Sequence, residues 1–316
     1  VNCEDKDKES KGKNPYAFER ENGWKKVSDE DKSAIEAYAK DYIGFISTAK
    51  TERESHDVVL AGAVEKGYRN LDEIIAKGGT LKAGDTVYRS YMGRTLFLAK
   101  IGSHPVTDGV RIVGGHIDAP RLDLKQIPLY EDSDLAFFDT HYYGGIKKYQ
   151  WVAMPLALHG VIVKQNGEKI SFSIGEDDSD PVFTITDLLP HLGKEQAKKS
   201  LEEGISGEGL NLLIGSRPES ADAGKGKVKD AILNLLHEKY GINEEDLQIA
   251  DIEIVPAGRA RELGLDRSMI LGYGQDDRIC AYPAYRALAD MKETPAFTSV
   301  ALLCDKEEIG STGATG

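Results

Sequence analysis

Helical patterns alternate with short apolar runs at both ends of the sequence, and this alternation limits the possible folds more than any other feature. A helical pattern covers 28–49, and a capping box at Thr51 and Glu54 predicts that a second helix follows it. Later, an amphipathic helix from about 276 precedes an apolar strand over 297–305. Apolar strands that alternate with helices are typical of sheets buried on both faces. We therefore expect an α/β fold with a mixed sheet sandwiched by helices.

The middle of the sequence has a different pattern, in which hairpins and polar loops predominate. Its strongest signal is a hairpin over 160–175 with Asn166-Gly167 at the turn. The other elements that the patterns predict are a pair of strands over 86–102 with a turn at Gly93-Arg94, a strand over 108–120, a helix over 228–240 and a strand over 247–256. We therefore expect an α/β domain in two pieces, 1–120 and 266–316, interrupted by a β-rich insert over 121–265.

The charge balance of the chain argues against some classes of partner. Its 316 residues contain 40 Lys and Arg against 53 Asp and Glu, a net charge of −13, whereas phosphate binding needs a basic surface. No apolar run approaches the roughly 18 residues of a membrane span, and the polar N-terminus lacks the apolar core of a secretory signal. Three widely spaced cysteines without a CxxC pair are typical of reduced thiols. We expect a cytoplasmic protein that binds neither nucleic acid nor membrane.

Three polar clusters each lie at the end of an apolar run. They are His116 with Asp118, Asp276 with Asp277, and Glu307 with Glu308. Taken singly, each has a plain interpretation, as a hydrogen-bonded surface pair, a helix N-cap or a solvated pair of charges. However, adjacent like charges directly after a buried strand are costly unless something positive lies beside them. Because ligands bind beyond the carboxyl ends of strands in such sheets, we expect the clusters to meet at one edge.

Together, the clusters have the composition of a site for divalent metal ions. His116 supplies an imidazole, and Asp118, on the same side of a strand, can accept the other ring N–H and orient it. One of the paired aspartates can bridge two ions about 3.5–4 Å apart. Of the two adjacent glutamates, one can bind metal while the other acts as general base. Histidine combined with carboxylate oxygens suits zinc, manganese or cobalt.

Three segments resemble, in this order, the aspartyl aminopeptidase and vacuolar aminopeptidase I family of dinuclear zinc metallopeptidases: GGHIDAPRLDLK, QDDRICAYPAYRAL and CDKEEIGSTGATG. The KTERE near residue 50 and the YGG at 143–145 are also similar to this family. The resemblance implies a zinc-peptidase, phosphorylase-like fold in which the insert is a dimerisation domain and dimers assemble into a dodecamer. It also implies an aminopeptidase that hydrolyses the N-terminal residue of peptides through a water bridged by two divalent metals, with zinc the expected ion.

The resemblance also implies a role for each residue of the clusters. Metal ligands would be His116, Asp276 as the bridge, and Glu308, while Asp118 would orient the histidine and Glu307 would be the general base. A cis peptide bond would join Asp276 to Asp277. The candidate for a substrate-site histidine supplied by the neighbouring subunit is His191. The family has two further ligands, an aspartate and a histidine, downstream of the glutamate pair, so the resemblance implies that this sequence is a fragment of a longer chain.

Two other functions are open on the residues alone. An assembly or binding protein could keep the fold without the chemistry, because two expected ligands are absent from the sequence. A glycosidase could use one of the glutamates with Asp276, but it would leave the pair of His116 and Asp118 without a role. The sequence also leaves open whether an acidic or a neutral N-terminal residue is cleaved.

Overall fold

The computed structural model describes residues 14, 16–18, 20–164, 166–220, 227–310 and 315. The chain divides into two compact units, Val1–Asp41 and Tyr42–Gly316, and helix α1 (Asp29–Thr48) runs from the first into the second. The first unit also contains the short 3-10 helix η1 (Gly23–Lys25). Both sheets described below belong to the second unit. Within the described residues, no helix has the length and apolar character that crossing a bilayer requires.

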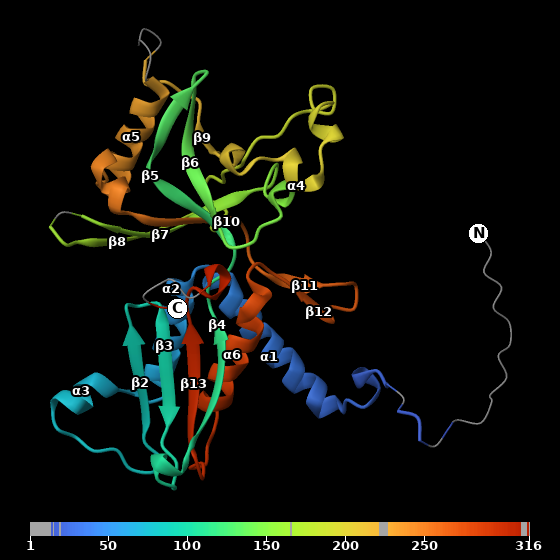
Figure 1. Ribbon diagram of the computed structural model, residues 1–316, viewed down its shortest axis with the longest axis vertical. Helices are drawn as coiled ribbons and strands as arrows, with labels where there is room; N and C mark the ends of the chain where they lie inside the picture. The colour runs from blue at the N-terminus through green and yellow to red at the C-terminus, as the bar shows by residue number, and fades with distance from the viewer. Residues whose placement is uncertain are drawn as a thin grey trace. The chain divides into compact units, whose positions relative to one another are not determined.

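The first sheet has five strands in the order β1-β2-β3-β13-β4 (Figure 1). Their bounds are β1 (Arg69–Asn70), β2 (Thr86–Tyr91), β3 (Thr95–Lys100), β4 (Val110–His116) and β13 (Thr298–Cys304). Although β13 comes last in sequence among the described strands, it lies between β3 and β4, antiparallel to β3 and parallel to β4. The parallel register pairs Cys304 with His116. As a result, the residues that follow β4 and β13 leave the sheet at the same edge.

Helices cover both faces of this sheet, as the sequence predicts. Helices α2 (Glu52–Glu65) and α6 (Gln275–Ala289) pack together on one face, where Gly62 of α2 lies against the hydroxyl of Tyr285. Helix α3 (Leu71–Ala76) covers part of the other face. The side chains in this second contact are Leu71 and Ile74 with Val87, Ala99 and Val300. The mixed sheet between helices is therefore confirmed.

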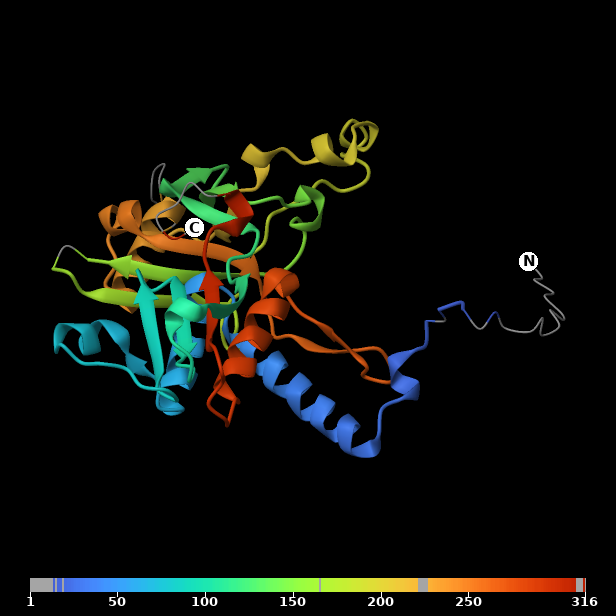
Figure 2. The ribbon, with the colours of Figure 1, turned by 60° about the horizontal axis from the view of Figure 1, so that its bottom comes forward.

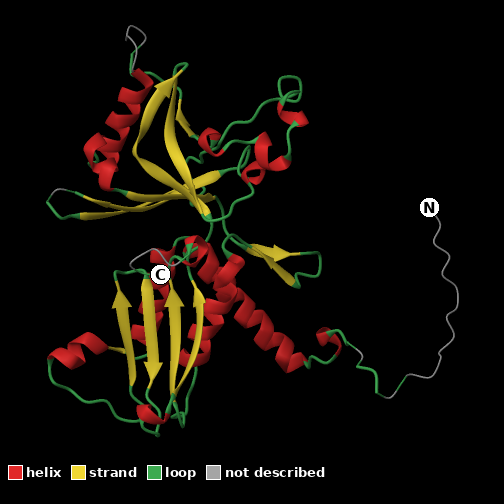
Figure 3. Ribbon diagram, viewed as in Figure 1, coloured by secondary structure: helices red, strands yellow, loops and turns green. Residues whose placement is uncertain are grey.

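The second sheet has six strands in the order β8-β7-β10-β5-β6-β9, and Figure 3 shows it as separate from the first. Its strands are β5 (Arg121–Asp132), β6 (Leu135–Tyr143), β7 (Leu156–Val163), β8 (Lys169–Ile174), β9 (Leu212–Gly215) and β10 (Asp251–Pro256). Helix α5 (Lys227–Tyr240) packs its apolar side chains against the buried core of this sheet. The remaining elements are β11 (Arg261–Leu263), β12 (Met269–Leu271), α4 (Leu201–Gly204), η2 (Val106–Asp108), η3 (Lys148–Gln150), η4 (Gln196–Lys198), η5 (Gly207–Gly209), η6 (Glu244–Ile249) and η7 (Glu307–Ile309).

Most predicted elements are present, with some shifted bounds. The hairpin around Gly167 is formed by β7 and β8, which extend the sheet beyond β10 (Figure 2). The turn between β2 and β3 has Met92 and Gly93 at its centre, both with positive φ, one residue earlier than predicted. Strand β10 starts only at Asp251, because a capping box at Asn243 begins the 3-10 helix η6 where the strand was expected. Strand β4 ends at His116, before the predicted end at Pro120.

Candidate metal centre

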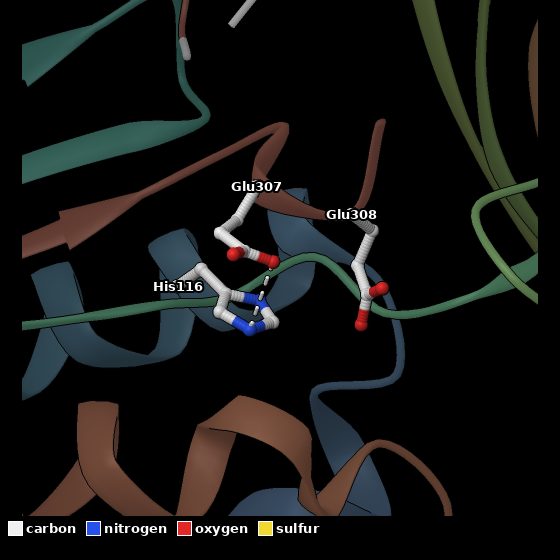
Figure 4. A group of neighbouring side chains, drawn as sticks. All are labelled: His116, Glu307 and Glu308. Atoms are coloured by element: carbon white, nitrogen blue, oxygen red, sulfur yellow. Dashed lines mark ion pairs between the residues drawn. The ribbon is translucent and has the colours of Figure 1, made fainter. Parts of the chain in front are cut away.

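Three of the predicted site residues meet beyond the ends of β4 and β13 (Figure 4). His116, Glu307 and Glu308 each offer one ligand atom, and these atoms all lie within 4.8 Å of one another. The carboxylate of Glu307 points toward the imidazole, with Oε2 3.7 Å from Nε2 of His116. Lys306, at φ 67°, turns the chain into η7 directly after β13 and so places both glutamates over His116. No other such group of three His, Cys, Asp or Glu side chains occurs among the residues that the structure describes.

Asp118 is a fully buried carboxylate that holds these residues together. Nδ1 of His116 donates a 3.0 Å hydrogen bond to the backbone oxygen of Asp118 and lies 3.2 Å from its Oδ1. The same Oδ1 accepts a hydrogen bond from the backbone N–H of Glu307 at 3.3 Å. Its Oδ2 accepts from the backbone N–H of Glu308 at 3.2 Å and from the hydroxyl of Tyr143 at 2.7 Å. The orientation of the histidine is the role that the sequence predicts for Asp118. The attachment of the glutamate turn to the same carboxylate is a finding of the structure.

Asp276 and Asp277 lie at the start of α6, beside the imidazole. Oδ1 of Asp276 is 3.2 Å from Nε2 of His116, and its side chain is 87% exposed. The peptide bond between the two aspartates is cis, as the resemblance implies. Helix α6 comes this close to β4 because Gly115 has no side chain. A Cβ at Gly115 would lie 2.9 Å from Oδ2 of Asp277 and 3.0 Å from the backbone nitrogen of Ala281.

The crowding of carboxylates around one imidazole shifts the pKa values of the centre. Burial opposes the charged form of His116, but the hydrogen bond and charge of Asp118 outweigh it and raise the pKa of His116 to about 9. Burial likewise opposes the charged form of Asp118, yet the hydrogen bonds that it accepts lower its pKa to about 2. Burial and the neighbouring carboxylates raise the pKa of Glu308. This concentration of negative charge is one that a bound cation would relieve.

His191 and Tyr143 are two residues outside the group predicted to surround His116. His191 lies in an exposed turn and is not one of the residues around His116, so its role in a neighbouring subunit stays a prediction. Tyr143 contacts Asp118, but the sequence assigned it no role. The YGG motif at 143–145 was the available signal, because it belongs to the resemblance and follows a strand pattern. The next residue, Gly144, has φ +70°, and a Cβ there would lie 3.2 Å from the Cβ of Glu308.

Comparison with known proteins identifies relatives of this chain. The model of a family described as aminopeptidase I zinc metalloprotease (M18) matches residues 45–316. A probable M18 family aminopeptidase 1 of Clostridium acetobutylicum is 53% identical over 303 residues, which are 96% of this chain and 65% of the relative. This chain thus spans slightly less than two thirds of the length of that relative.

Solved structures agree with the sequence comparison. The crystal structure of an M18 family aminopeptidase from Thermotoga maritima matches with a TM-score of 0.88 and 44% identity, over 95% of this chain and 64% of that one. The mApe1 dodecamer of S. cerevisiae matches with a TM-score of 0.65 and 19% identity, over 90% of this chain and 64% of that one. The second likeness is one of fold alone.

Proposed function

The chain belongs to the aminopeptidase I family of zinc metalloproteases (M18), and from this premise we propose that it carries the centre of a metal-dependent aminopeptidase. Its substrates would be peptides, from which it removes the N-terminal residue. The observation that carries this proposal is the arrangement around Asp118. Asp118 contacts the imidazole of His116 through its backbone oxygen and its buried carboxylate, and the same carboxylate holds the turn of Glu307 and Glu308 over this imidazole.

The donor set at this spot fits zinc. Imidazole nitrogen and carboxylate oxygen are both zinc ligands, and Nε2 of His116 faces the carboxylates because Asp118 occupies Nδ1. We assign His116 and Glu308 to one ion each and Asp276 to a bridge between two ions, while cobalt or manganese would suit the same donors. When bound, such an ion supplies Lewis-acid polarisation of the scissile carbonyl and acidification of a water.

Glu307 is the general base in this proposal. Its side chain is 65% exposed and extends from η7 over the imidazole, where a substrate and a water have access to it. Glu307 would take a proton from the attacking water and pass it to the leaving amine of the peptide. Asp118 would keep this carboxylate in place through the backbone N–H of the same residue.

We also propose the organisation of the chain into catalytic parts at 1–120 and 266–316 and an insert at 121–265. Strands on both sides of the insert share the first sheet, and all strands of the second sheet lie within the insert. The insert would be a dimerisation domain, with dimers building a dodecamer like that of mApe1, and with His191 reaching the neighbouring site. Its exposed apolar side chains favour such an interface. They include Leu188, Leu189, Leu192 and Leu201. The cytoplasm is the location that we propose.

Metal content and peptidase activity, both measured on one preparation of the natural, full-length protein, test this proposal. We expect about two divalent ions per chain and release of N-terminal residues from short peptides. A chelator should abolish the activity, and zinc should restore it. Peptides that begin with acidic or with neutral residues would define the preference. Metal binding without peptidase activity, or activity that a chelator leaves unchanged, would contradict the proposal and favour a binding protein or another hydrolase.

A further inference from the structure

Tyr143 connects the second sheet to the metal centre. It is the last residue of β6, a strand of the second sheet, and it is 7% exposed. Its hydroxyl donates a 2.7 Å hydrogen bond to Oδ2 of Asp118, which lies just beyond the end of β4 in the first sheet. It is shorter than the hydrogen bonds that the carboxylate of Asp118 accepts from the backbone N–H groups of Glu307 and Glu308. The end of β6 in the second sheet therefore contacts Asp118, which organises the centre at the edge of the first sheet.

The ring of Tyr143 is held in place from behind. The guanidinium carbon of Arg121 lies 3.8 Å from the centre of this ring. Three carboxylates fix Arg121 itself, with Asp123 at 2.8 Å, Glu253 at 3.1 Å and Glu52 at 3.3 Å. Because Arg121 is 3% exposed and paired on several sides, it forms a rigid surface on which the ring stacks. The hydroxyl thus has little freedom to leave Asp118.

Gly144 extends this support to the second glutamate. Its φ is positive, and a Cβ at Gly144 would lie 3.2 Å from the Cβ of Glu308, so a side chain there would be tightly packed against this glutamate. Two adjacent residues at the end of β6 therefore contact Asp118 and Glu308. Tyr143 holds Asp118 by a hydrogen bond, and Gly144 packs against Glu308.

We propose that Tyr143 is a positioning residue of the metal centre, which fixes Asp118 and through it both His116 and the turn of Glu307 and Glu308. A phenol suits this role because it donates a hydrogen bond and does not compete for metal. Without it, Oδ2 keeps a single backbone donor and Asp118 can rotate away from the turn. The inference rests on the proposed function only for the identity of the bound ion.

Replacement of one hydroxyl tests the inference, with the neighbouring tyrosine as control. Tyr143→Phe removes the hydrogen bond and keeps the ring on Arg121. Tyr142→Phe removes the hydroxyl of an exposed residue of the same strand. In metal-free protein, we expect Tyr143→Phe to speed amide exchange of a peptide containing Glu307 and Glu308 by about tenfold, as measured by mass spectrometry. In competition with a chelator, its affinity for zinc should fall about 10- to 100-fold. Tyr142→Phe should change neither quantity.

A double-mutant cycle separates positioning from a general loss of structure. Asp118→Asn should weaken zinc binding, and the addition of Tyr143→Phe to it should weaken binding by much less than in the wild type, because the two residues act together. The inference would be overturned if Tyr143→Phe and the wild type had equal amide exchange rates in the glutamate turn. It would also be overturned if the losses of zinc affinity in the double mutant were fully additive. If the wild-type protein had no affinity for zinc, the proposed function would be overturned instead. The amide exchange rates of the metal-free wild type and Tyr143→Phe would still decide the role of Tyr143.

Discussion

Glu307 and Glu308 are adjacent in the sequence but have different surroundings. Glu307 is exposed above His116, whereas Glu308 is partly buried, and burial and nearby carboxylates raise its pKa. The accessible glutamate suits proton transfer with a water, and the enclosed one suits a ligand whose charge a cation balances. This difference supports the separate roles that the resemblance implies for the two residues.

Replacement of Glu307 tests its role as general base. Glu307→Gln keeps the shape of the side chain but removes its ability to accept a proton, so we expect kcat to fall about 10²- to 10⁴-fold. Zinc content, measured by atomic absorption, should change little. The control is Glu238→Gln, which changes an exposed glutamate of α5. A variant that keeps more than half of its kcat would show that another group takes the proton.

Two consecutive glycines at the end of β6 offer a matched comparison. Gly144 has φ +70° and lies against Glu308, whereas a Cβ at Gly145 would have no atom within 4 Å. Gly144→Ala should lower the free energy of unfolding by about 1–2 kcal/mol, because a left-handed backbone is costly for alanine. It should also weaken zinc binding. Gly145→Ala should be nearly neutral in thermal unfolding, and equal losses in the two variants would contradict this account.

At the scale of elements, the start of α2 explains the KTERE motif. Thr51 caps the helix, and Glu54 completes the capping box that the sequence predicts. The other side chains of the motif reach the region of the second sheet. Lys50 donates to the backbone oxygens of Pro256 and Gly258, and Arg53 pairs with Asp251 at 2.7 Å. The beginning of one helix is thus a contact region between the two sheets.

The capping residue of α2 provides a test at this scale. Thr51→Ala removes the acceptor for the backbone N–H of Glu54 in a buried position, so we expect a loss of about 1 kcal/mol in the free energy of unfolding. Urea denaturation would measure it. Thr80→Ala, at an exposed threonine outside helices and strands, is the control and should change stability by less than about 0.5 kcal/mol. Equal stability of the two variants would contradict the importance of the cap.

At the scale of the second unit, His159 joins helix α2 to the second sheet. It lies on β7, with Nδ1 2.7 Å from Glu54 and Nε2 3.1 Å from Glu176. Burial opposes the charged form of this histidine, but the two carboxylates outweigh it and raise its pKa to about 8. Glu176 also pairs with Lys50, at 2.7 Å. The contact between helix and sheet therefore includes a group that loses its charge in mildly alkaline solution.

The raised pKa of His159 predicts how stability depends on pH. The folded state binds the proton more tightly than the unfolded state, so this contribution is complete below about pH 6.5 and is lost as the pH rises through about 8. The full effect is about 2 kcal/mol. Metal-free protein should therefore lose more stability between pH 6 and pH 9 than its His159→Gln variant. His104→Gln, at an exposed histidine, should keep the wild-type dependence, and identical profiles of all three proteins would refute the assignment.

The sequence by itself determined the class of the fold and predicted which chemical groups form the proposed centre. Both depend on local information: the periodicity of apolar residues, the caps, and short motifs such as the one around His116. Only the tertiary structure decided that β13 enters between β3 and β4, and that Asp118 holds the glutamate turn as well as the histidine. It also decided that Tyr143 reaches Asp118 from the other sheet. These contacts join segments far apart in the chain, and strand pairing and packing, which no local pattern encodes, bring them together.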